Sequence, residues 1–182
     1  LISDGINVNV TLLFKMSMYE AVAEEYIAGL EAFVAGGGDP SGVASVASFF
    51  ISRIDSAIDS TIEARLKTAQ SAEERMMLRS LAGKIAIANA KLTYQRYKEI
   101  YRGARWQALA AKNAQTQRLL WASTSTKNPS YRDVIYVEEL IGRDTVDTVP
   151  TATFDAFRDH GRARASLEEH LEEAHATMET LE

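Results

Sequence analysis

The sequence predicts an α/β fold built around a parallel β-sheet. Four apolar, strand-like segments occur along the 182 residues, and segments with helical periodicity follow each of them. Such alternation is typical of βα units whose strands lie side by side in one parallel sheet. The length and the 46% hydrophobic content are enough for one domain or for part of a larger one.

The first predicted strand covers residues 5–14. Its composition is that of a buried strand, yet it carries two polar residues, Asn9 and Thr11. Because they are two residues apart, their side chains point the same way. An apolar strand of this kind needs neighbours, so we expect the chain to begin in the middle of a larger fold. Apolar residues at helical spacing then predict a helix over 16–34.

The second predicted strand, 43–51, is followed by several helical segments. Ile54, Ile58, Ile62 and Leu66 share one helix face. The capping box that starts at Ser71 predicts a single long helix from about residue 72 to 101. A short extra helix is expected over 109–112.

The last third of the chain repeats the strand–helix alternation. The remaining predicted elements are a strand over 118–123, a polar turn over 124–129, a helix over 133–141, a short strand over 144–150, a helix over 152–158, and a final helix after a capping box at 166–169.

Two architectures fit this order of elements. A doubly wound sheet could close with four or five strands, whereas a (β/α)8 barrel needs eight strands in about 250 residues. No glycine-rich phosphate fingerprint follows any predicted strand, which disfavours a nucleotide-binding doubly wound fold. Four βα units amount to half of a barrel.

Composition excludes several classes of function. The net charge of −5 and the pI of about 5.3 do not favour nonspecific binding to nucleic acid or to anionic membranes. The absence of cysteine excludes disulfides and thiolate metal sites. No apolar run reaches the roughly 18 residues that span a bilayer, and the start lacks the features of a signal peptide. We expect a cytoplasmic protein without nucleic-acid or membrane partners, present as a fragment or a processed chain.

Polar residues gather where the predicted strands end, which is where active sites of barrels lie. They are Asn9, Thr11, Ser48, Arg53 and the run from Ser123 to Asn128. Arg53 and Lys127 could bind an anionic group such as a sugar phosphate, as a fork-shaped and a point-charge donor. The pattern alone, however, favours Arg53 as a surface residue of a helix start and Lys127 as an ordinary turn lysine over ligand-binding roles. No carboxylate pair, metal cluster or Ser-His-Asp arrangement accompanies them.

Several segments resemble the transaldolases, in order and over nearly the whole chain. They are GINVNVTLLF (5–14), VASVASFFISRID (43–55), GKIAIANAK (83–91), LWASTSTKNP (120–129), DTVDTVP (144–150) and DHG (159–161). The sequence is most similar to the bacterial branch that has a long inserted helix. Some members of that branch are fused to a glucose-6-phosphate isomerase domain.

The resemblance implies a (β/α)8 TIM barrel of which residues 1–182 are the C-terminal half, strands five to eight, truncated at both ends. It implies cofactor-free transfer of a dihydroxyacetone unit between ketose and aldose phosphates through a lysine Schiff base. The implied partners are fructose 6-phosphate, sedoheptulose 7-phosphate, erythrose 4-phosphate and glyceraldehyde 3-phosphate. The family's lysine lies on the strand before the Asn9 strand, so it is expected upstream of this chain. The fragment itself is then expected to be inactive, and Lys127 is not the nucleophile.

The same resemblance assigns roles by position. Asn9 corresponds to the amide that holds the substrate, and Thr11 to the hydroxyl that positions the catalytic water. The substrate-binding positions are Ser48, Phe50, Arg53, Lys127, and either Ser123 or Ser125 as the serine partner of Lys127. Lys15 and Asp147 stand where close relatives are expected to have Ser and Asn, and both are interpreted as neutral. No metal ligand is implied.

Two other interpretations remain open. The chain could belong to a fructose-6-phosphate aldolase-like barrel, which cleaves without transfer. It could also be a non-catalytic half-barrel that serves as an interaction module, and a homo-oligomer is compatible with every interpretation.

Overall fold

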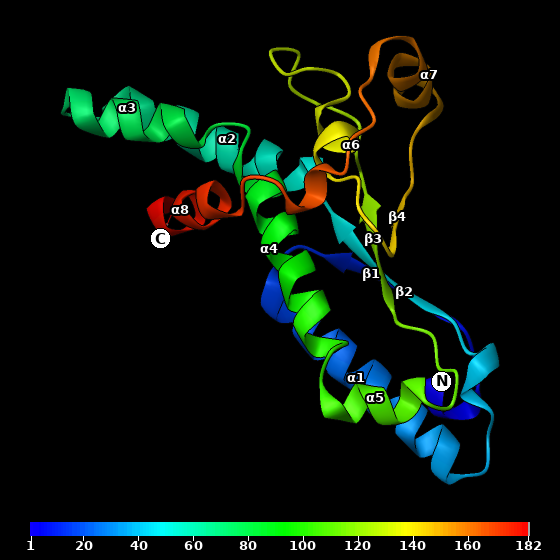
Figure 1. Ribbon diagram of the computed structural model, residues 1–182. Helices are drawn as coiled ribbons and strands as arrows, with labels where there is room; N and C mark the ends of the chain where they lie inside the picture. Colours follow the sequence, from blue (N-terminus) through cyan, green and yellow to red (C-terminus); the bar gives the residue numbers. More distant parts are fainter. Residues whose placement is uncertain (182) are drawn as a thin grey trace. The chain divides into compact units, whose positions relative to one another are not determined.

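The computed structural model describes residues 1–181, which form four strands, eight α-helices and three short 3-10 helices (Figure 1). The strands are β1 (Val8–Leu13), β2 (Ser45–Phe50), β3 (Arg118–Ala122) and β4 (Thr145–Asp147). The α-helices are α1 (Met16–Ala35), α2 (Ser52–Thr68), α3 (Ala72–Leu81), α4 (Ile85–Ile100), α5 (Ala104–Ala110), α6 (Ile135–Glu139), α7 (Thr151–His160) and α8 (Leu171–Leu181). The 3-10 helices are η1 (Ile2–Asp4), η2 (Pro40–Gly42) and η3 (Ser166–Glu168).

The four strands form one sheet in the order β1-β2-β3-β4. β1 and β2 are parallel, with Val8 opposite Ser45, and the register shifts between Val10 and Leu13. Each strand therefore lies beside the one before it in sequence, with helices in the connections, as expected of successive βα units. The predicted α/β class is confirmed, and the half-barrel arrangement stays a prediction.

The chain divides into two compact units. Unit 1 comprises Leu1–Phe49, Thr93–Leu120 and Asp144–Val146. Unit 2 comprises Phe50–Leu92, Trp121–Arg143 and the residues from Asp147 onward.

The core of unit 1 is built on the predicted face of α1. Tyr19, Ala23, Tyr26 and Leu30 are buried at helical spacing. Helix α5 runs beside α1 (Figure 1), and its Trp106 is also buried. A row of aromatic rings continues this core, because the Tyr101 and Trp106 centroids are 4.7 Å apart in an edge-on contact.

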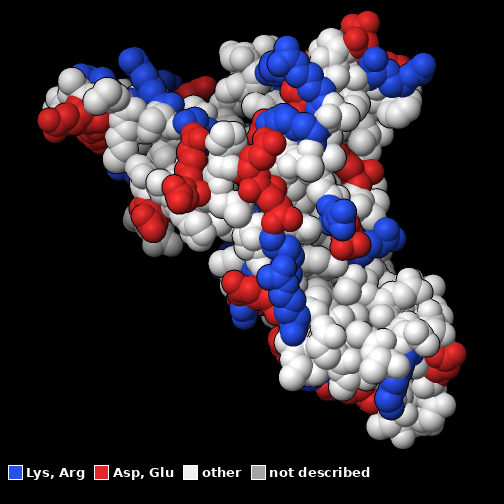
Figure 2. Space-filling view, in the orientation of Figure 1, with Lys and Arg blue, Asp and Glu red and all other residues white. Residues whose placement is uncertain are grey.

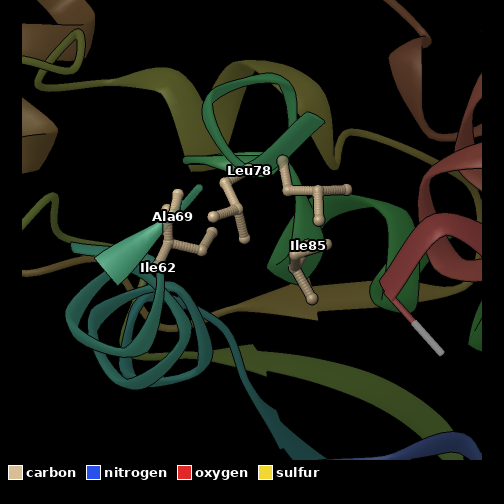
Figure 3. Close-up of a cluster of buried hydrophobic side chains, with 5 residues drawn as sticks. Ile62, Ala69, Leu78 and Ile85 are labelled. Atoms are coloured by element: carbon tan, nitrogen blue, oxygen red, sulfur yellow. The ribbon is translucent and has the colours of Figure 1, made fainter. Parts of the chain in front are cut away.

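A separate apolar cluster stabilises the helices of unit 2. Figure 3 shows Ile62, Ala69, Leu78 and Ile85 directed toward one another. They come from α2, the α2–α3 connection, α3 and the first residue of α4, and Leu81 completes the set. Because α2 and α3 are amphipathic, this contact removes their apolar faces from water.

The long helix predicted from residue 72 to 101 is wrong in one respect, since it is two helices. Ser71 caps α3 as predicted, its Oγ accepting a hydrogen bond from the Glu74 amide at 3.0 Å. The break falls at Gly83, whose φ of +71° is open to glycine at little cost. A Cβ there would lie 2.6 Å from the ring of Tyr131, so the close approach of that ring also requires glycine.

Three other predicted elements need correction. The final helix does follow residues 166–169, since α8 begins at Leu171, but Ser166 does not cap it: Ser166 opens the 3-10 helix η3, and its hydroxyl donates to the Glu138 carbonyl. The short helix expected over 109–112 is α5, which begins directly after Gly103. The fourth strand is confined to Thr145–Asp147.

The first strand is not buried as predicted. β1 lies at one edge of the sheet and pairs with β2 alone. Asn9 and Thr11 are exposed, Leu12 is 52% exposed, and only Leu13 is buried. Composition reveals that a strand is apolar, but it cannot reveal on how many sides the strand is paired.

Charged residues are interspersed on the visible surface. Figure 2 shows Lys and Arg beside Asp and Glu, without a broad area of one sign. Many of them form ion pairs, among them Arg105 with Glu24 and Glu31. Across residues 1–181, no helix is both long enough and apolar enough to cross a membrane.

Candidate functional site

In unit 1, Asn9 and Ser48 are in direct contact. The Ser48 Oγ donates a hydrogen bond to Asn9 Oδ1 over 2.7 Å, and Ser48 is only 3% exposed. Nearby, the Ala44 amide donates to Asn7 Oδ1 and the Ser45 hydroxyl to the Val8 carbonyl. These side-chain bonds fasten β1 to β2 and fix the direction of the Asn9 amide.

Thr11 lies two residues further along β1, within the register shift between Val10 and Leu13. It is exposed, and its hydroxyl makes no hydrogen bond to any of the described residues. Asn9, Thr11 and Ser48 thus form one group of polar side chains in unit 1.

In unit 2, Phe50 and Arg53 form a second pair. The Arg53 guanidinium carbon lies 4.8 Å from the centroid of the Phe50 ring, a cation–π contact. Phe50 ends β2, whereas Arg53 stands in the first turn of α2 and is exposed. No carboxylate among residues 1–181 forms an ion pair with Arg53, so its charge is available to an anionic ligand.

The chain leaves β3 through a strained turn, Ser123–Lys127. Ser123 has a φ of +60°, which is uncommon for a residue other than glycine. Its Oγ lies 3.0 Å from Ser52 Oγ, and its carbonyl accepts from the Ser52 amide at 3.0 Å. These contacts join the start of α2 to the end of β3.

Lys127, at the end of this turn, contacts Ser125. Its Nζ donates a hydrogen bond to Ser125 Oγ over 2.7 Å, and its side chain is exposed. Of the two serines that could accompany Lys127, Ser125 therefore makes the contact, while Ser123 bonds to Ser52. An ammonium group beside a hydroxyl can bind an oxyanion through both donors.

Thr124 was expected only as one member of the polar run from Ser123 to Asn128, without a role of its own, and Asp147 was not expected to be functional. Thr124 is fully buried, and its hydroxyl donates to Asp147 Oδ1 over 2.9 Å. Burial raises the pKa of Asp147 from 3.8 to about 6, although the Thr124 hydrogen bond lowers it in part. Asp147 ends β4, and a carboxylate at a strand end was the signal that sequence reasoning set aside as neutral variation.

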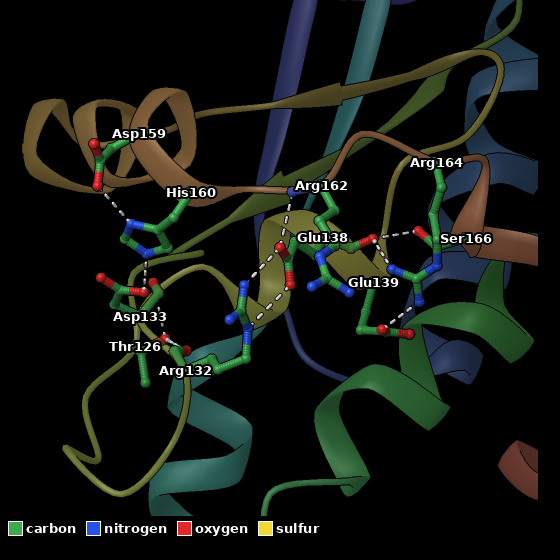
Figure 4. A network of polar contacts seen from close by, with 10 residues as sticks. All are labelled: Thr126, Arg132, Asp133, Glu138, Glu139, Asp159, His160, Arg162, Arg164 and Ser166. Atoms are coloured by element: carbon green, nitrogen blue, oxygen red, sulfur yellow. Dashed lines mark hydrogen bonds and ion pairs between the residues drawn. The ribbon is translucent and has the colours of Figure 1, made fainter.

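A network of charged residues links the segment after the Ser123–Lys127 turn to α7 and to the residues that follow α7 (Figure 4). His160 of α7 lies between Asp133 and Asp159, with its Nε2 2.9 Å from Asp133 Oδ1. The two carboxylates raise the pKa of His160, with Asp133 the larger cause. Arg132 binds Glu138 in bidentate fashion, and the Arg162 amide donates to the same carboxylate.

Two buried aspartates of α2 bind the start of α4. Asp55 accepts hydrogen bonds from the Ala86 amide and the Tyr136 hydroxyl, both at 2.8 Å. Asp59 accepts from the Gly83 amide and the Tyr131 hydroxyl. These carboxylates satisfy amides of the new helix start and fix the position where the predicted long helix breaks.

The structure thus defines a class of α/β protein with polar and cationic side chains at the ends of parallel strands. The family described as Transaldolase/Fructose-6-phosphate aldolase matches residues 1–182. The chain belongs to this family, which confirms the resemblance found in the sequence.

Curated relatives match almost all of the chain. It is 54% identical over 180 residues to a protein named Transaldolase from Trichodesmium erythraeum (strain IMS101), covering 99% of this chain and 47% of that protein. It is 53% identical over 183 residues to Transaldolase 2 from Nostoc sp. (strain PCC 7120), covering 99% and 48%. It is 45% identical over 181 residues to a Transaldolase from Frankia alni, covering 99% and 47%. The chain spans about half the length of these relatives.

Proposed function

We propose that this chain is part of a transaldolase, which transfers a dihydroxyacetone unit between a ketose phosphate and an aldose phosphate. The observation that carries the proposal is the match over 99% of the chain to relatives named Transaldolase. The donors would be fructose 6-phosphate or sedoheptulose 7-phosphate. The acceptors would be erythrose 4-phosphate or glyceraldehyde 3-phosphate.

In this proposal the reaction proceeds through a lysine Schiff base. A lysine amine attacks the ketose carbonyl, water leaves, and a protonated imine forms. The imine withdraws electrons as a C–C bond breaks, the aldose departs, and the retained carbanion adds to the aldehyde of the acceptor. We propose that this lysine belongs to the part of the relatives that the chain does not cover, within a (β/α)8 barrel whose strands five to eight lie in residues 1–182.

The side chains of this chain would supply binding and proton transfer. Asn9, held by Ser48, would bind a substrate hydroxyl near the imine, and Thr11 would hold the water that carries protons. Arg53 would bind the phosphate as a two-pronged donor, with Phe50 under its guanidinium. Lys127 and Ser125 would bind the same phosphate from the other strand end.

Borohydride trapping tests the location of the nucleophile. The chain is incubated with fructose 6-phosphate and sodium borohydride, and its mass is measured. We expect no covalent adduct. Lys127 is exposed but contacts only Ser125 among the described residues, and Lys91 is 2% exposed and ion-paired with Glu139. A stable adduct on any lysine of this chain would contradict the proposal.

Titration with inorganic phosphate tests the anion site. Arg53→Ala should weaken binding by about tenfold, the value of one charged hydrogen bond. Arg158→Ala is the matched control, because Arg158 also lies over a phenyl ring, that of Phe154, at 5.7 Å. If Arg53→Ala and Arg158→Ala weakened phosphate binding equally, Arg53 would have no specific role in binding the anion.

The family description also covers fructose-6-phosphate aldolases, which are the second candidate. The two activities differ in the acceptor. A polypeptide that carries this sequence together with the Schiff-base lysine should turn over fructose 6-phosphate only when erythrose 4-phosphate is present, if it is a transaldolase. Release of free dihydroxyacetone without acceptor would favour the aldolase.

A further inference from the structure

The Ser123–Lys127 turn is joined to β4 through one side-chain pair, in which Thr124 is fully buried and Asp147 is half-buried. The Thr124 hydroxyl donates to Asp147 Oδ1 at 2.9 Å, and a longer contact of 3.4 Å leads to the Thr148 carbonyl. Thr148 in turn donates from its amide and its hydroxyl to the Trp121 carbonyl, at 3.1 and 3.2 Å. The C-terminal parts of β3 and β4 and the residues that follow them are therefore joined by both main-chain and side-chain bonds.

Such fastening matters because the turn begins in an unfavourable backbone conformation. A non-glycine residue with a positive φ persists only where its surroundings hold it, and Ser123 has a φ of +60°. Ser52 holds Ser123 on one side, and Asp147 holds the next residue, Thr124, on the other. Ser125 and Lys127 follow directly, so the direction of their side chains depends on these anchors.

The hydrogen bond between Thr124 and Asp147 depends on the charge of Asp147. A carboxylate only accepts hydrogen bonds, whereas a protonated carboxyl also donates, so the Thr124 contact is favoured when Asp147 is ionised. Burial opposes that ionisation and raises the pKa of Asp147 to about 6. Thr124, the side chain that faces Asp147 from the turn, is neutral, and its second acceptor is the backbone carbonyl of Thr148.

We propose that Asp147 is a positioning residue, which acts through Thr124 to hold the Ser123–Lys127 turn in its anion-binding conformation. The proposal rests on the proposed function, in which this turn binds the phosphate of a sugar phosphate. It replaces the interpretation of Asp147 as neutral variation.

The test combines NMR and phosphate titration on the 182-residue chain. In the free protein, the amide signals of residues 123–127 should shift with a midpoint at a pH of about 6. Asp147→Asn should abolish this transition while preserving the Thr124 contact, because the asparagine oxygen still accepts. Asp155→Asn, a change of an exposed aspartate on α7, is the control and should leave the transition intact.

At a pH of about 7.5, Thr124→Val and Asp147→Ala should each weaken the binding of inorganic phosphate by about fivefold, the value of one hydrogen bond. Asp147→Asn should retain affinity within about twofold, because its side-chain oxygen still accepts from Thr124, whereas the loss in Thr124→Val separates hydrogen bonding from a purely steric role. Amide signals that do not respond near pH 6, or unchanged affinity in Thr124→Val, would overturn the proposal. If the unaltered chain binds no phosphate, the proposed phosphate-binding role of the turn fails, while the NMR transition still decides whether Asp147 holds the turn.

Discussion

Ser48 and Asn9 lie on adjacent parallel strands, and the buried Ser48 hydroxyl directs the exposed Asn9 amide through a bond of 2.7 Å. A buried donor thus limits the conformations of a surface side chain. Asn9 is thereby held in one orientation before any ligand binds, which lowers the entropy cost of binding.

Ser48→Ala should lower the free energy of unfolding by about 1 kcal/mol, because one partly buried hydrogen bond is lost. The midpoint of urea denaturation measures the change. Thr11→Ala is the control: its exposed hydroxyl has no partner among residues 1–181, so the midpoint should not move. A larger effect at Thr11 than at Ser48 would contradict this description of β1.

Asp55→Ala should be among the most destabilising changes, costing about 3 kcal/mol. It would leave the Ala86 amide and the Tyr136 hydroxyl without their acceptor in a site where Asp55 itself is 1% exposed. Asp55→Asn should cost far less, because the amide oxygen can still accept from Ala86 while its nitrogen donates to Tyr136. Equal destabilisation by both substitutions would show that charge, rather than hydrogen bonding, is essential at this position.

The pH dependence at Asp55 provides a second readout. Burial raises its pKa above 3.8, and hydrogen bonds from Ala86 and Tyr136 lower it in part. Because the folded pKa exceeds the unfolded one, the folded state binds more protons, and this group's contribution to stability decreases as the pH rises above about 3.8. The Asp55→Asn variant should therefore become more stable relative to the unaltered chain as the pH rises over that range.

Tyr19→Phe should be neutral or stabilising by about 1 kcal/mol. Tyr19 is fully buried, its hydroxyl has no partner among the described residues, and burial strongly raises its pKa. Tyr26→Phe is the matched control, since the Tyr26 hydroxyl donates to the Gln115 carbonyl at 2.7 Å. Thermal unfolding should rank the variants with Tyr19→Phe above Tyr26→Phe, and the reverse order would refute the assignment.

His160 should titrate above its ordinary value of 6.5, because Asp133 and Asp159 both stabilise the imidazolium. Asp133→Asn should lower the midpoint, as measured by NMR of the imidazole ring. Because its pKa is raised in the folded state, His160 contributes to the free energy of unfolding fully below a pH of 6.5, and this contribution is lost as the pH rises through the folded pKa. A midpoint that does not change in Asp133→Asn would show that the ion pair is absent in solution.

Elements that depend on local pattern could be predicted from the sequence. The face of α1, the Ser71 cap and the presence of four strands follow from periodicity and capping residues, whereas the order of the strands within the sheet was not predicted. The break at Gly83 could not be predicted, because the alanine-rich period continues through it and the break depends on Asp59 and Tyr131, which are distant in sequence.

The candidate site divides in the same way. Asn9 could be chosen because it is a polar residue within an apolar strand, and Arg53 and Lys127 because they follow strands. Thr124 could not be paired with Asp147 from sequence, since 23 residues separate them and only the adjacency of β3 and β4 brings them together. Their roles in binding stay predictions.

The apolar cluster of unit 2 has a consequence for the resistance of the chain to proteases. Met178 and Leu181 of α8 pack against the cluster formed by α2 and α3, so the last described helix covers part of their shared apolar surface. Cleavage before α8 would expose that surface, and the amides of α2 and α3 should then exchange with solvent faster than in the uncleaved chain. The stability of α2 and α3 thus depends in part on α8, which is distant from them in sequence.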